Sequence, residues 1–298
     1  MFWLKVMISV LIPTYNHNCY RLANDLHAQL ATCGEEHELI IAEDGSKDQV
    51  SIIANHKITD LPNCRHIINK ENLGRARIIN FLINEAKGDW CIIMDSDARV
   101  VTTTFIKTYL DCAQKGYDVI VGSLVNPDKL PQPDATLRYK YEKAAEKFRS
   151  AEYRNIHPFE RFGTFNFMAR RSVLLEVPFD ERCTEYGYED TLMGIEMRRQ
   201  GKKVLHIDNP LMHLGFDNNA TFLKKTETSL HSLKKIEKDM LPYTPLGKMV
   251  IKLRRIHLAS IIGGIFRILK PLLRRNLLGN NPNLTLFSFY KLGYYLSL

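Results

Sequence analysis

Two aspartates separated by one residue directly follow an apolar run in this 298-residue chain. Trp90-Cys91-Ile92-Ile93-Met94 leads without a break into Asp95-Ser96-Asp97. Carboxylates held this close repel one another unless a cation lies between them. Magnesium and manganese prefer oxygen ligands and commonly bridge protein carboxylates to a diphosphate. A solvated turn with a helix cap is the alternative, but the position directly after a buried strand favours a metal site.

A second acidic pair, Glu189-Asp190, follows Tyr186-Gly187-Tyr188 at the start of a helix expected over residues 190–200. The helix dipole favours a carboxylate in a first turn, so a helix cap is one explanation. The functional alternative is a general base, whose pKa neighbouring aromatic groups would tune. His213 is a single histidine in an apolar segment, which is usually a core residue; it becomes a metal ligand only if the fold brings it to the aspartates.

Strand-like and helical patterns alternate through the first part of the chain. Solid apolar runs predict strands, and four-residue spacing of apolar side chains predicts helices between them. The expected strands are residues 6–12, 38–42, 65–69, 90–94 and 118–122. Strands that are apolar on both faces predict an α/β fold with a mostly parallel central sheet and helices on both faces.

After Gly122 the predicted strands and helices no longer alternate regularly. A strand followed by a short helix is expected over 163–177, and one further strand over 203–207. Helices are expected over 139–153 and 219–239, and the prolines 242 and 245 mark a boundary. We therefore predict a catalytic domain over 1–240 and a basic helical extension over 241–298.

Ligands of open α/β sheets bind beyond the carboxyl ends of the strands. Three expected strand ends carry polar turns: Pro13-Thr14-Tyr15-Asn16, Glu43-Asp44-Gly45-Ser46 and Asp95-Ser96-Asp97. The glycine-rich fingerprints of dinucleotide and phosphate-loop sites are missing after the first strand. A nucleotide bound here would need its phosphates neutralised by a metal and by side chains.

The distribution of charge and the spacing of the cysteines limit the classes of protein to which this chain can belong. The net charge is +8, yet residues 240–298 hold nine Lys and Arg and no Asp or Glu, so the remaining chain is near neutral. A neutral body argues against nucleic-acid binding. The six cysteines form no Cys-x-x-Cys pair, so we expect them to be reduced in a cytoplasmic protein.

These motifs, in this order, resemble the family 2 glycosyltransferases of the GT-A fold over about Val6 to Gly215. The resemblance implies a nucleotide-sugar site, with Asp44 at the uracil ring, Arg75 at its carbonyl and Asp95 at the ribose and metal shell. It also implies a metal on Asp97 and His213, and Asp190 as the base that deprotonates the acceptor. The remaining residues of the expected nucleotide-sugar site are Pro13, Thr14, Tyr15, Asn72 and Ser96. The sugar and acceptor pocket is expected to include Gly163, Asn166 and Tyr188, with Glu189 beside the base.

The implied reaction is a single inverting displacement from a UDP-sugar to a saccharide acceptor, with magnesium or manganese on the diphosphate. Many family members carry a tryptophan shortly before the acidic pair, where this chain has Tyr186 and Tyr188. The alternatives are a non-catalytic nucleotide-sugar-binding protein and a sugar nucleotidyltransferase. The second would need a glycine-rich loop with a basic residue after the first strand, where Pro13-Thr14-Tyr15-Asn16 stands instead.

The basic extension contains an amphipathic helical pattern that begins at Ile261. Its expected apolar face holds residues 261, 262, 265, 268, 269, 272 and 273, and its basic face holds Arg267, Lys270 and Arg274. Pro271 should break or kink the helix. This composition favours an anionic membrane surface on the cytoplasmic side, and a lipid-linked saccharide acceptor with it. A helix packed on the body or on a second copy is the alternative.

Overall fold

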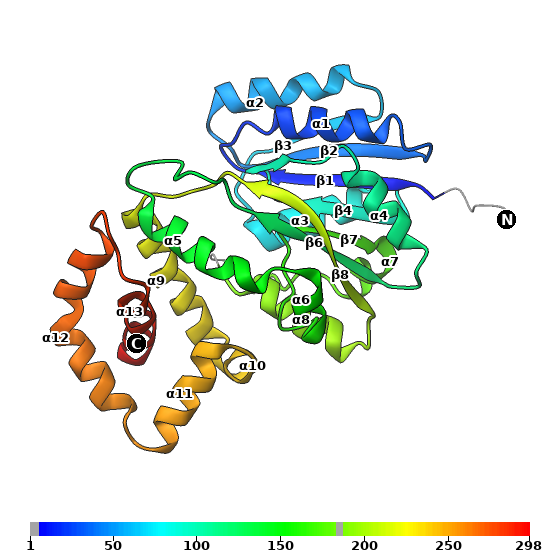
Figure 1. Ribbon diagram of the computed structural model, residues 1–298. Coiled ribbons are helices and arrows are strands. Elements are labelled where there is room, and N and C mark those ends of the chain that lie inside the picture. Colours follow the sequence, from blue (N-terminus) through cyan, green and yellow to red (C-terminus); the bar gives the residue numbers. More distant parts are fainter. Residues whose placement is uncertain (1–5, 183–186) are drawn as a thin grey trace. The chain divides into compact units, whose positions relative to one another are not determined.

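The computed structural model describes residues 6–182 and 187–298 (Figure 1). The chain divides into two compact units. The first extends through residue 125 and includes 148–184 and 193–215. The second contains 126–147, 185–192 and 216–298. Each unit is described by itself below.

An eight-stranded sheet forms the centre of the first unit, counted over the described residues, in the order β3-β2-β1-β4-β7-β6-β8-β5. Its strands are β1 (Ile8–Thr14), β2 (His37–Asp44), β3 (Cys64–Asn69), β4 (Trp90–Met94), β5 (Ala98–Val100), β6 (Val119–Val125), β7 (Asn166–Arg170) and β8 (Val204–His213). The half formed by β3, β2, β1 and β4 is parallel, as is the β6–β8 pair. β7 runs antiparallel to β4 and β6, and β5 antiparallel to β8. The predicted mostly parallel sheet is confirmed.

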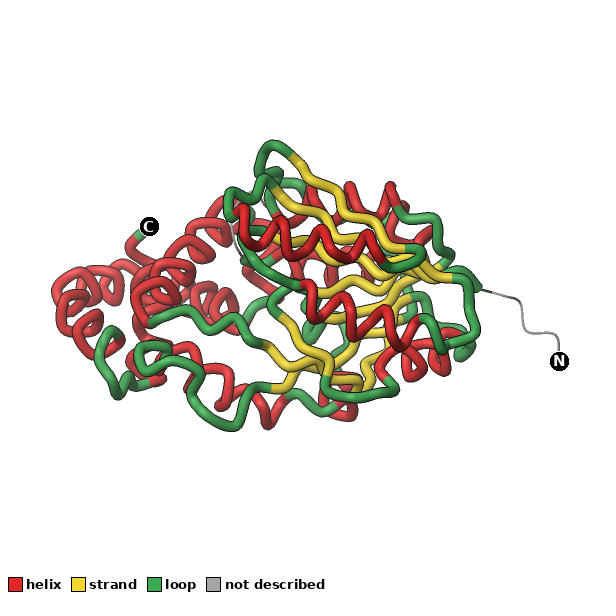
Figure 2. The backbone as a smooth tube through the Cα atoms, turned by 90° about the horizontal axis from the view of Figure 1, so that it is seen from above, coloured by secondary structure: helices red, strands yellow, loops and turns green. Residues whose placement is uncertain are grey.

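Helices cover both faces of this sheet (Figures 1 and 2). Alternate residues of β1 separate two apolar cores, because successive strand side chains point to opposite faces. Leu11 packs with α3 (Arg75–Glu85), α7 (Arg171–Glu176) and the later turns of α8 (Glu189–Arg199). Val10 and Ile12 pack on the other face with α1 (Tyr20–Leu30) and α4 (Phe105–Ala113). The shorter helices of this unit are α2 (Gln49–His56), η1 (Lys57–Asp60) and α6 (Ala151–Ile156).

The structure corrects several predicted boundaries. β1 continues through Pro13 to Thr14, although the sequence predicts a strand that ends before the proline. β4 pairs with β1 only as far as Leu11, so the missing proline N–H removes no bond from the β1–β4 ladder. The helix predicted over 139–153 is interrupted: α5 (Thr136–Ala145) and η2 (Glu146–Phe148) precede the separate helix α6. The strand predicted to end at Ile207 continues to His213.

The second unit is helical. Besides α5 it contains α9 (Asn219–Lys235), α10 (Glu237–Met240), η3 (Leu241–Tyr243), α11 (Pro245–Arg255), α12 (Ala259–Leu277) and α13 (Leu284–Ser297). In Figure 1, α13 lies between α9, α11 and α12, and it contacts all three. α9 contributes Phe222 and Leu223 to the same core as Phe266 of α12 and Phe287 of α13.

One close helix contact and two acids fix α13 in this unit. Gly293 lies against the ring of Phe266, where a β-carbon would come within 2.5 Å. Tyr290 donates to Glu227 of α9, and Tyr295 donates to Glu237 of α10. The helices on either side of residue 240 therefore share one core. The boundary predicted at that residue remains a prediction of where the basic extension begins.

Candidate active site

The Asp95-Ser96-Asp97 turn connects β4 to the short strand β5. The Asp95 N–H donates to the Phe165 carbonyl at 3.1 Å, and the Asp97 carbonyl accepts from the Leu214 N–H at 2.8 Å. The β5–β8 register pairs Ala98 with His213. Both ends of the turn are therefore held by backbone contacts, which position its side chains.

His213 reaches the second aspartate of this turn. Its Nε2 lies 3.4 Å from Asp97 Oδ2, and the imidazole is buried. The Phe165 ring packs edge-on against the imidazole, with the ring centroids 5.5 Å apart. The sequence left His213 open between a core residue and a metal ligand, and the fold places it at the Asp-x-Asp turn.

Gly215 leaves the space that the Asp97 carboxylate uses. A β-carbon at residue 215 would lie 1.8 Å from Asp97 Oδ2 and 3.2 Å from His213 Nε2. An imidazole nitrogen and a carboxylate oxygen side by side suit a divalent ion such as manganese. The described residues contain no group of three or more His, Cys, Asp and Glu side chains arranged to hold a metal. Magnesium is usually held by one or two carboxylates together with substrate phosphates, so a small protein ligand set fits a metal–diphosphate site.

Arg75, the first residue of α3, connects the other aspartate to a neighbouring segment. Its Nη2 donates to Asp95 Oδ1 at 2.6 Å and to the Thr164 carbonyl at 3.2 Å. Thr164 is fully buried and lies just before β7. One guanidinium thus joins the start of α3, the Asp-x-Asp turn and the segment predicted to line the sugar pocket.

Asp44, at the end of β2, is held by the loop that precedes α3. Its two carboxylate oxygens accept from the backbone N–H groups of Leu73, at 2.7 Å, and Gly74, at 3.1 Å. Burial raises the pKa of this carboxyl, and the two N–H groups partly oppose the rise. Asn72 also donates to the Asp44 carbonyl at 3.0 Å. The predicted base-binding residues Asp44 and Asn72 are therefore neighbours.

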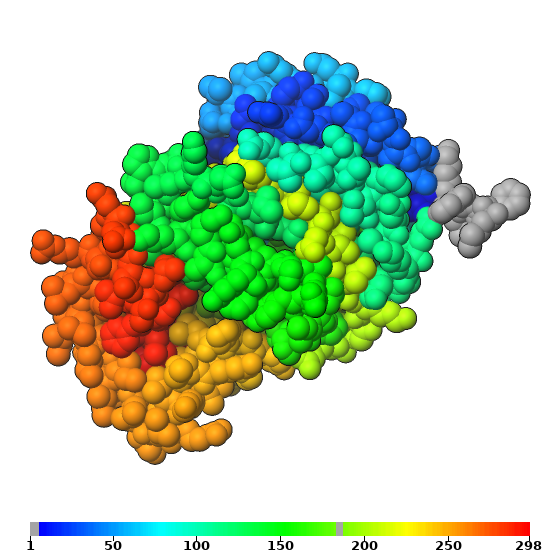
Figure 3. Space-filling view, in the orientation of Figure 1, coloured from blue at the N-terminus to red at the C-terminus, as the bar shows by residue number. Residues whose placement is uncertain are grey.

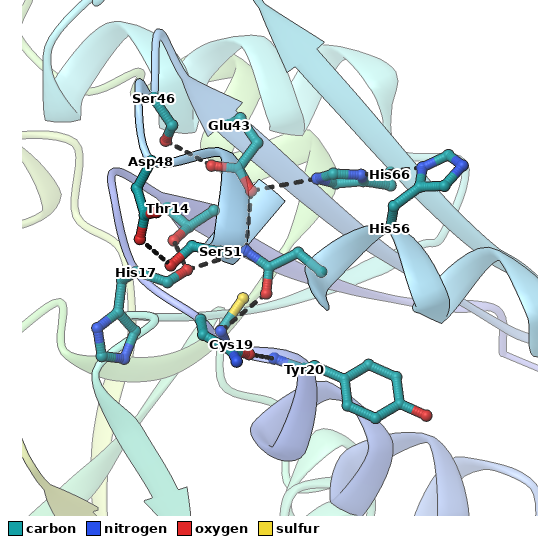
Figure 4. Close-up of polar contacts among 12 residues, drawn as sticks. Thr14, His17, Cys19, Tyr20, Glu43, Ser46, Asp48, Ser51, His56 and His66 are labelled. Carbon is teal, nitrogen blue, oxygen red and sulfur yellow. Dashed lines mark hydrogen bonds and ion pairs between the residues drawn. The ribbon is translucent and has the colours of Figure 1, made fainter. Parts of the chain in front are cut away.

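Next to Asp44 in the chain, the buried Glu43 carboxylate connects the end of β2 to β3, to α2 and to the turn after β2 (Figure 4). Glu43 accepts from Asn55 at 2.8 Å and from Ser46, and His66 Nε2 lies 3.2 Å from it. Burial alone would raise the pKa of Glu43, but these hydrogen bonds outweigh it and hold the pKa below its ordinary value. Asn16, at a positive φ of 50°, donates its N–H to Ser46 Oγ at 2.9 Å. The turns after β1 and β2 are thus bonded to one another.

Other predicted nucleotide-sugar residues lie in or beside β1 and the Asp-x-Asp turn. Pro13 and Thr14 are buried in β1, and Thr14 Oγ1 donates to the His17 carbonyl at 3.1 Å. Tyr15 is exposed directly after the strand, and Ser96 is partly buried in its turn. These assignments remain predictions.

The predicted pocket residue Asn166 is engaged within the sheet. Its side chain accepts from the buried Tyr109 hydroxyl at 2.5 Å and donates to the Ser123 and Asn209 carbonyls. Gly163 is partly buried three residues earlier. These hydrogen bonds hold the start of β7 in place. The contact of Asn166 with sugar remains a prediction.

The acidic pair occupies the first turn of α8, in the part of that helix that belongs to the second unit. Gly187 and Tyr188 precede it with positive φ angles of 112° and 72°. A β-carbon at Gly187 would lie 2.5 Å from the Ser229 side chain, so the chain comes close to α9 there. Burial, and then the neighbouring Tyr141, raise the pKa of Tyr188 to about 12. Tyr186 lies outside the described residues. The base assignment to Asp190, with Glu189 beside it, remains a prediction.

The family follows from a comparison of the sequence with known proteins. Residues 9–177, more than half of the chain, match glycosyl transferase family 2. The chain belongs to this family. A curated relative, glycosyltransferase GlyG of Streptococcus pneumoniae, is 31% identical over 124 residues, which is 41% of this chain. The match spans 40% of that relative's length.

Two solved structures share the fold. The mannosyltransferase PcManGT from Pyrobaculum calidifontis, in complex with GDP-Man and Mn2+, has a TM-score of 0.55 at 13% identity. The likeness covers 97% of this chain and 84% of that one. Glucosyl-3-phosphoglycerate synthase from Mycobacterium tuberculosis, in complex with Mn2+, uridine diphosphate and glucosyl-3-phosphoglycerate, has a TM-score of 0.50 at 16% identity, over 77% of this chain and 79% of that one. The family 2 chain described here has the GT-A fold.

Sequence reasoning missed several residues that shape the site. Gly215 follows His213 by two residues, and nothing in the sequence shows that it faces Asp97. Glu43 precedes Asp44 in the quoted acidic turn; both are buried, and the contacts of Glu43 with Asn55, Ser46 and His66 were not predicted. Asn55 gave no signal, because its partners lie at distant positions in the sequence.

Proposed function

We propose that this glycosyltransferase moves a sugar from a UDP-sugar to a saccharide hydroxyl, by a single displacement that inverts the anomeric configuration. One observation carries the proposal: Asp97 Oδ2 and His213 Nε2 lie 3.4 Å apart at the turn after β4, over a glycine that leaves room for both. The family match and the manganese named for the two solved structures support the same reading.

The proposed metal-holding residues are Asp97 and His213, with Asp95 nearby. Manganese or magnesium bound there would act as a Lewis acid for the diphosphate leaving group. The chain's own part is to hold the two ligands in place: Phe165 packs on the imidazole, and the Leu214 N–H fixes the Asp97 backbone. Arg75 holds Asp95 and adds positive charge beside the turn.

A uracil base fits the Asp44 turn chemically. A carboxylate has about four lone-pair sites, and the backbone N–H groups of Leu73 and Gly74 account for two contacts. A ring N–H of uracil is a suitable further donor to Asp44. A guanidinium has five N–H donors, so Arg75 can serve a uracil carbonyl as well as Asp95.

Asp190 is the proposed base, and Glu189 its neighbour. Adjacent residues in a helix point about 100° apart, so one of the two faces the acceptor hydroxyl. The proton of that hydroxyl would pass to the Asp190 carboxylate as the oxygen bonds to the anomeric carbon. The sugar–phosphate bond breaks on the opposite face, which inverts the configuration.

Release of nucleoside diphosphate from UDP- and GDP-sugars, with and without manganese, tests the proposal. We expect turnover with a UDP-sugar that excess chelator abolishes, and a product of inverted configuration by NMR. Asp97→Asn and His213→Gln should each lower activity strongly, whereas Asp60→Asn, an exposed carboxylate elsewhere in the first unit, should not. Release of pyrophosphate would instead identify a nucleotidyltransferase. Donor binding without any turnover would identify a binding protein.

The acceptor and the place of action complete the proposal. A lipid-linked saccharide requires the enzyme to work at a membrane, and we place it on the cytoplasmic face as a peripheral protein. The support is compositional: residues 240–298 carry nine basic residues and no acidic residue.

A further inference from the structure

We propose that one face of α12, and not the whole amphipathic pattern, contacts an anionic lipid bilayer. Ile261, Ile265, Ile268 and Leu272, here called the α12 stripe, are 56%, 45%, 80% and 66% exposed. Their spacing of four, three and four residues places them along one side of a helix. The inference rests on the proposed membrane association and is independent of the sugar chemistry.

The other half of the predicted apolar face is used inside the second unit. Leu273 is buried and Leu269 is partly buried, in a core with Phe266, Phe287 and Tyr290. Helix–helix packing therefore accounts for these residues. It does not account for the α12 stripe, which faces away from α13.

The basic residues of α12 also form two groups, one in contact with other helices of the unit and one exposed. Arg274 donates to Glu227 of α9 at 2.8 Å, and Lys270 lies over the Tyr294 ring at 4.9 Å. These two charges stabilise the unit. Arg267 and Arg275 are exposed on the same helix as the α12 stripe, both on one side of it.

The turn between α11 and α12 also exposes apolar and basic side chains. Ile256 and Leu258 are exposed where α11 ends, and Lys252 and Arg255 are exposed beside them. In Figure 3 the orange atoms of α11 and α12 form part of the surface. Exposed apolar side chains among lysines and arginines, with no acid within residues 240–298, match anionic lipid headgroups above acyl chains.

Pro271 is compatible with this surface. The sequence predicts a break or kink there, but α12 runs through Pro271 from Ala259 to Leu277. The proline is exposed, next to Leu272 of the stripe. Within residues 6–182 and 187–298 no single helix is long and apolar enough to cross a membrane; α11 and α12 meet these criteria only together, bent by 116°.

Co-sedimentation of the full chain with lipid vesicles tests this face. We expect binding to vesicles of phosphatidylcholine with phosphatidylglycerol, and weak binding to phosphatidylcholine alone. Arg267→Gln with Arg275→Gln should weaken the anionic partitioning about thirtyfold, because each basic residue near such a surface contributes about 1 kcal/mol. Ile265→Ser with Ile268→Ser should weaken it at least about tenfold, at low and high salt alike.

Matched variants in the first unit provide the controls. Lys57→Gln with Lys115→Gln removes two exposed charges, and Val50→Ser with Ile53→Ser removes two exposed apolar side chains, which are 76% and 64% exposed. Neither pair should change vesicle binding. All variants should keep wild-type unfolding curves and wild-type turnover with a soluble acceptor.

The outcomes separate the two proposals. Vesicle binding that the α12 variants leave unchanged overturns this inference, while the membrane association stands. No binding of the full chain to either vesicle overturns both. A dimer in sedimentation velocity that Ile265→Ser with Ile268→Ser dissociates, without vesicle binding, shows that the α12 stripe meets a second copy instead. Absent sugar transfer alongside intact vesicle binding removes only the enzymatic proposal.

Discussion

Replacing Gly215 by alanine tests whether the Asp97–His213 pair holds the metal. The new methyl group would lie 1.8 Å from Asp97 Oδ2, where ordinary contacts begin near 3.4 Å. The carboxylate oxygen must therefore move by roughly 1.5 Å to reach a normal van der Waals distance. The contact with His213 Nε2, at 3.2 Å, requires only a slight further adjustment.

The fold should tolerate this movement better than the chemistry does. The Asp97 side chain is 32% exposed, and its carboxylate lies at the far end of that side chain, outside the apolar core. We expect the free energy of unfolding to change by less than about 1 kcal/mol, as for ordinary substitutions away from the core. A displacement of about 1 Å at a catalytic group can cost about a hundredfold, or about 2.7 kcal/mol of transition-state stabilisation.

Steady-state donor turnover across a manganese titration measures the effect. Gly215→Ala should lower kcat/KM about a hundredfold and raise the manganese concentration needed for half-maximal rate. Gly264→Ala is the matched control: it adds the same methyl group in a helix, where nothing lies within 4 Å. Its turnover should equal wild type, and its unfolding free energy should stay equal or rise by up to about 1 kcal/mol.

A folded Gly215→Ala protein with wild-type manganese dependence and wild-type kcat/KM would refute the assignment. A double-mutant cycle with His213→Gln gives a second criterion. If both residues act through one metal site, the double variant should lose much less than the product of the two single losses. Fully multiplicative losses would mean that the two residues act separately.

Three further predictions concern the base and the buried titratable groups. Asp190→Asn should abolish transfer while isothermal titration still shows donor binding; wild-type rates in Asp190→Asn together with loss in Glu189→Gln would reverse the assignment. Burial first, and then a neighbouring positive charge, lower the pKa of His206 to about 4 from 6.5, with a carbonyl hydrogen bond opposing. The unfolded chain therefore takes up this proton first as the pH falls, so the unfolding free energy should drop by about 3 kcal/mol between pH 6.5 and 4. Urea unfolding of His206→Gln should lack that slope, and an equal slope in both proteins would contradict it. Glu43→Gln should cost about 1–3 kcal/mol in urea unfolding, because amide nitrogen would face hydrogen-bond donors, whereas the exposed Glu152→Gln should cost nothing measurable.

The parallel half of the sheet could be predicted because its signal is local. The apolar runs near 38–42, 65–69 and 90–94 each become a strand of nearly that length. Such strands are buried on both faces, so an unbroken apolar run identifies them. β5 escaped prediction, because its three residues form a strand only through pairing with β8 more than a hundred residues later.

The candidate site shows the same contrast between features with a local sequence signal and features that depend on distant contacts. The residue types at strand ends placed Asp44, Asp95 and Asp97 at the same edge of the predicted sheet, and their roles remain predictions. Their partners could not be predicted in the same way. Arg75 binding to Asp95 joins positions 20 residues apart, and the Asp44 carboxylate meets two backbone N–H groups rather than side chains. Backbone donors carry no sequence signal, since every residue but proline has one.

The position of His213 depends on an irregularity in β8. The β6–β8 register shifts between Val121 and Ser123, where β6 advances two residues while β8 advances four. The backbone groups displaced there are met by Arg154, whose guanidinium donates to the Gly122 carbonyl at 2.6 Å and to the Ile207 carbonyl at 2.8 Å.

Side chains alternate between the faces of a strand, so a shift of one residue beyond this point would turn His213 to the opposite face, away from Asp97. The irregularity adds two residues to β8 and so keeps this alternation; a buried arginine in α6, with no place in any motif, helps to decide how far along the strand the candidate metal ligand lies. That is why the sequence could name His213 and yet not place it.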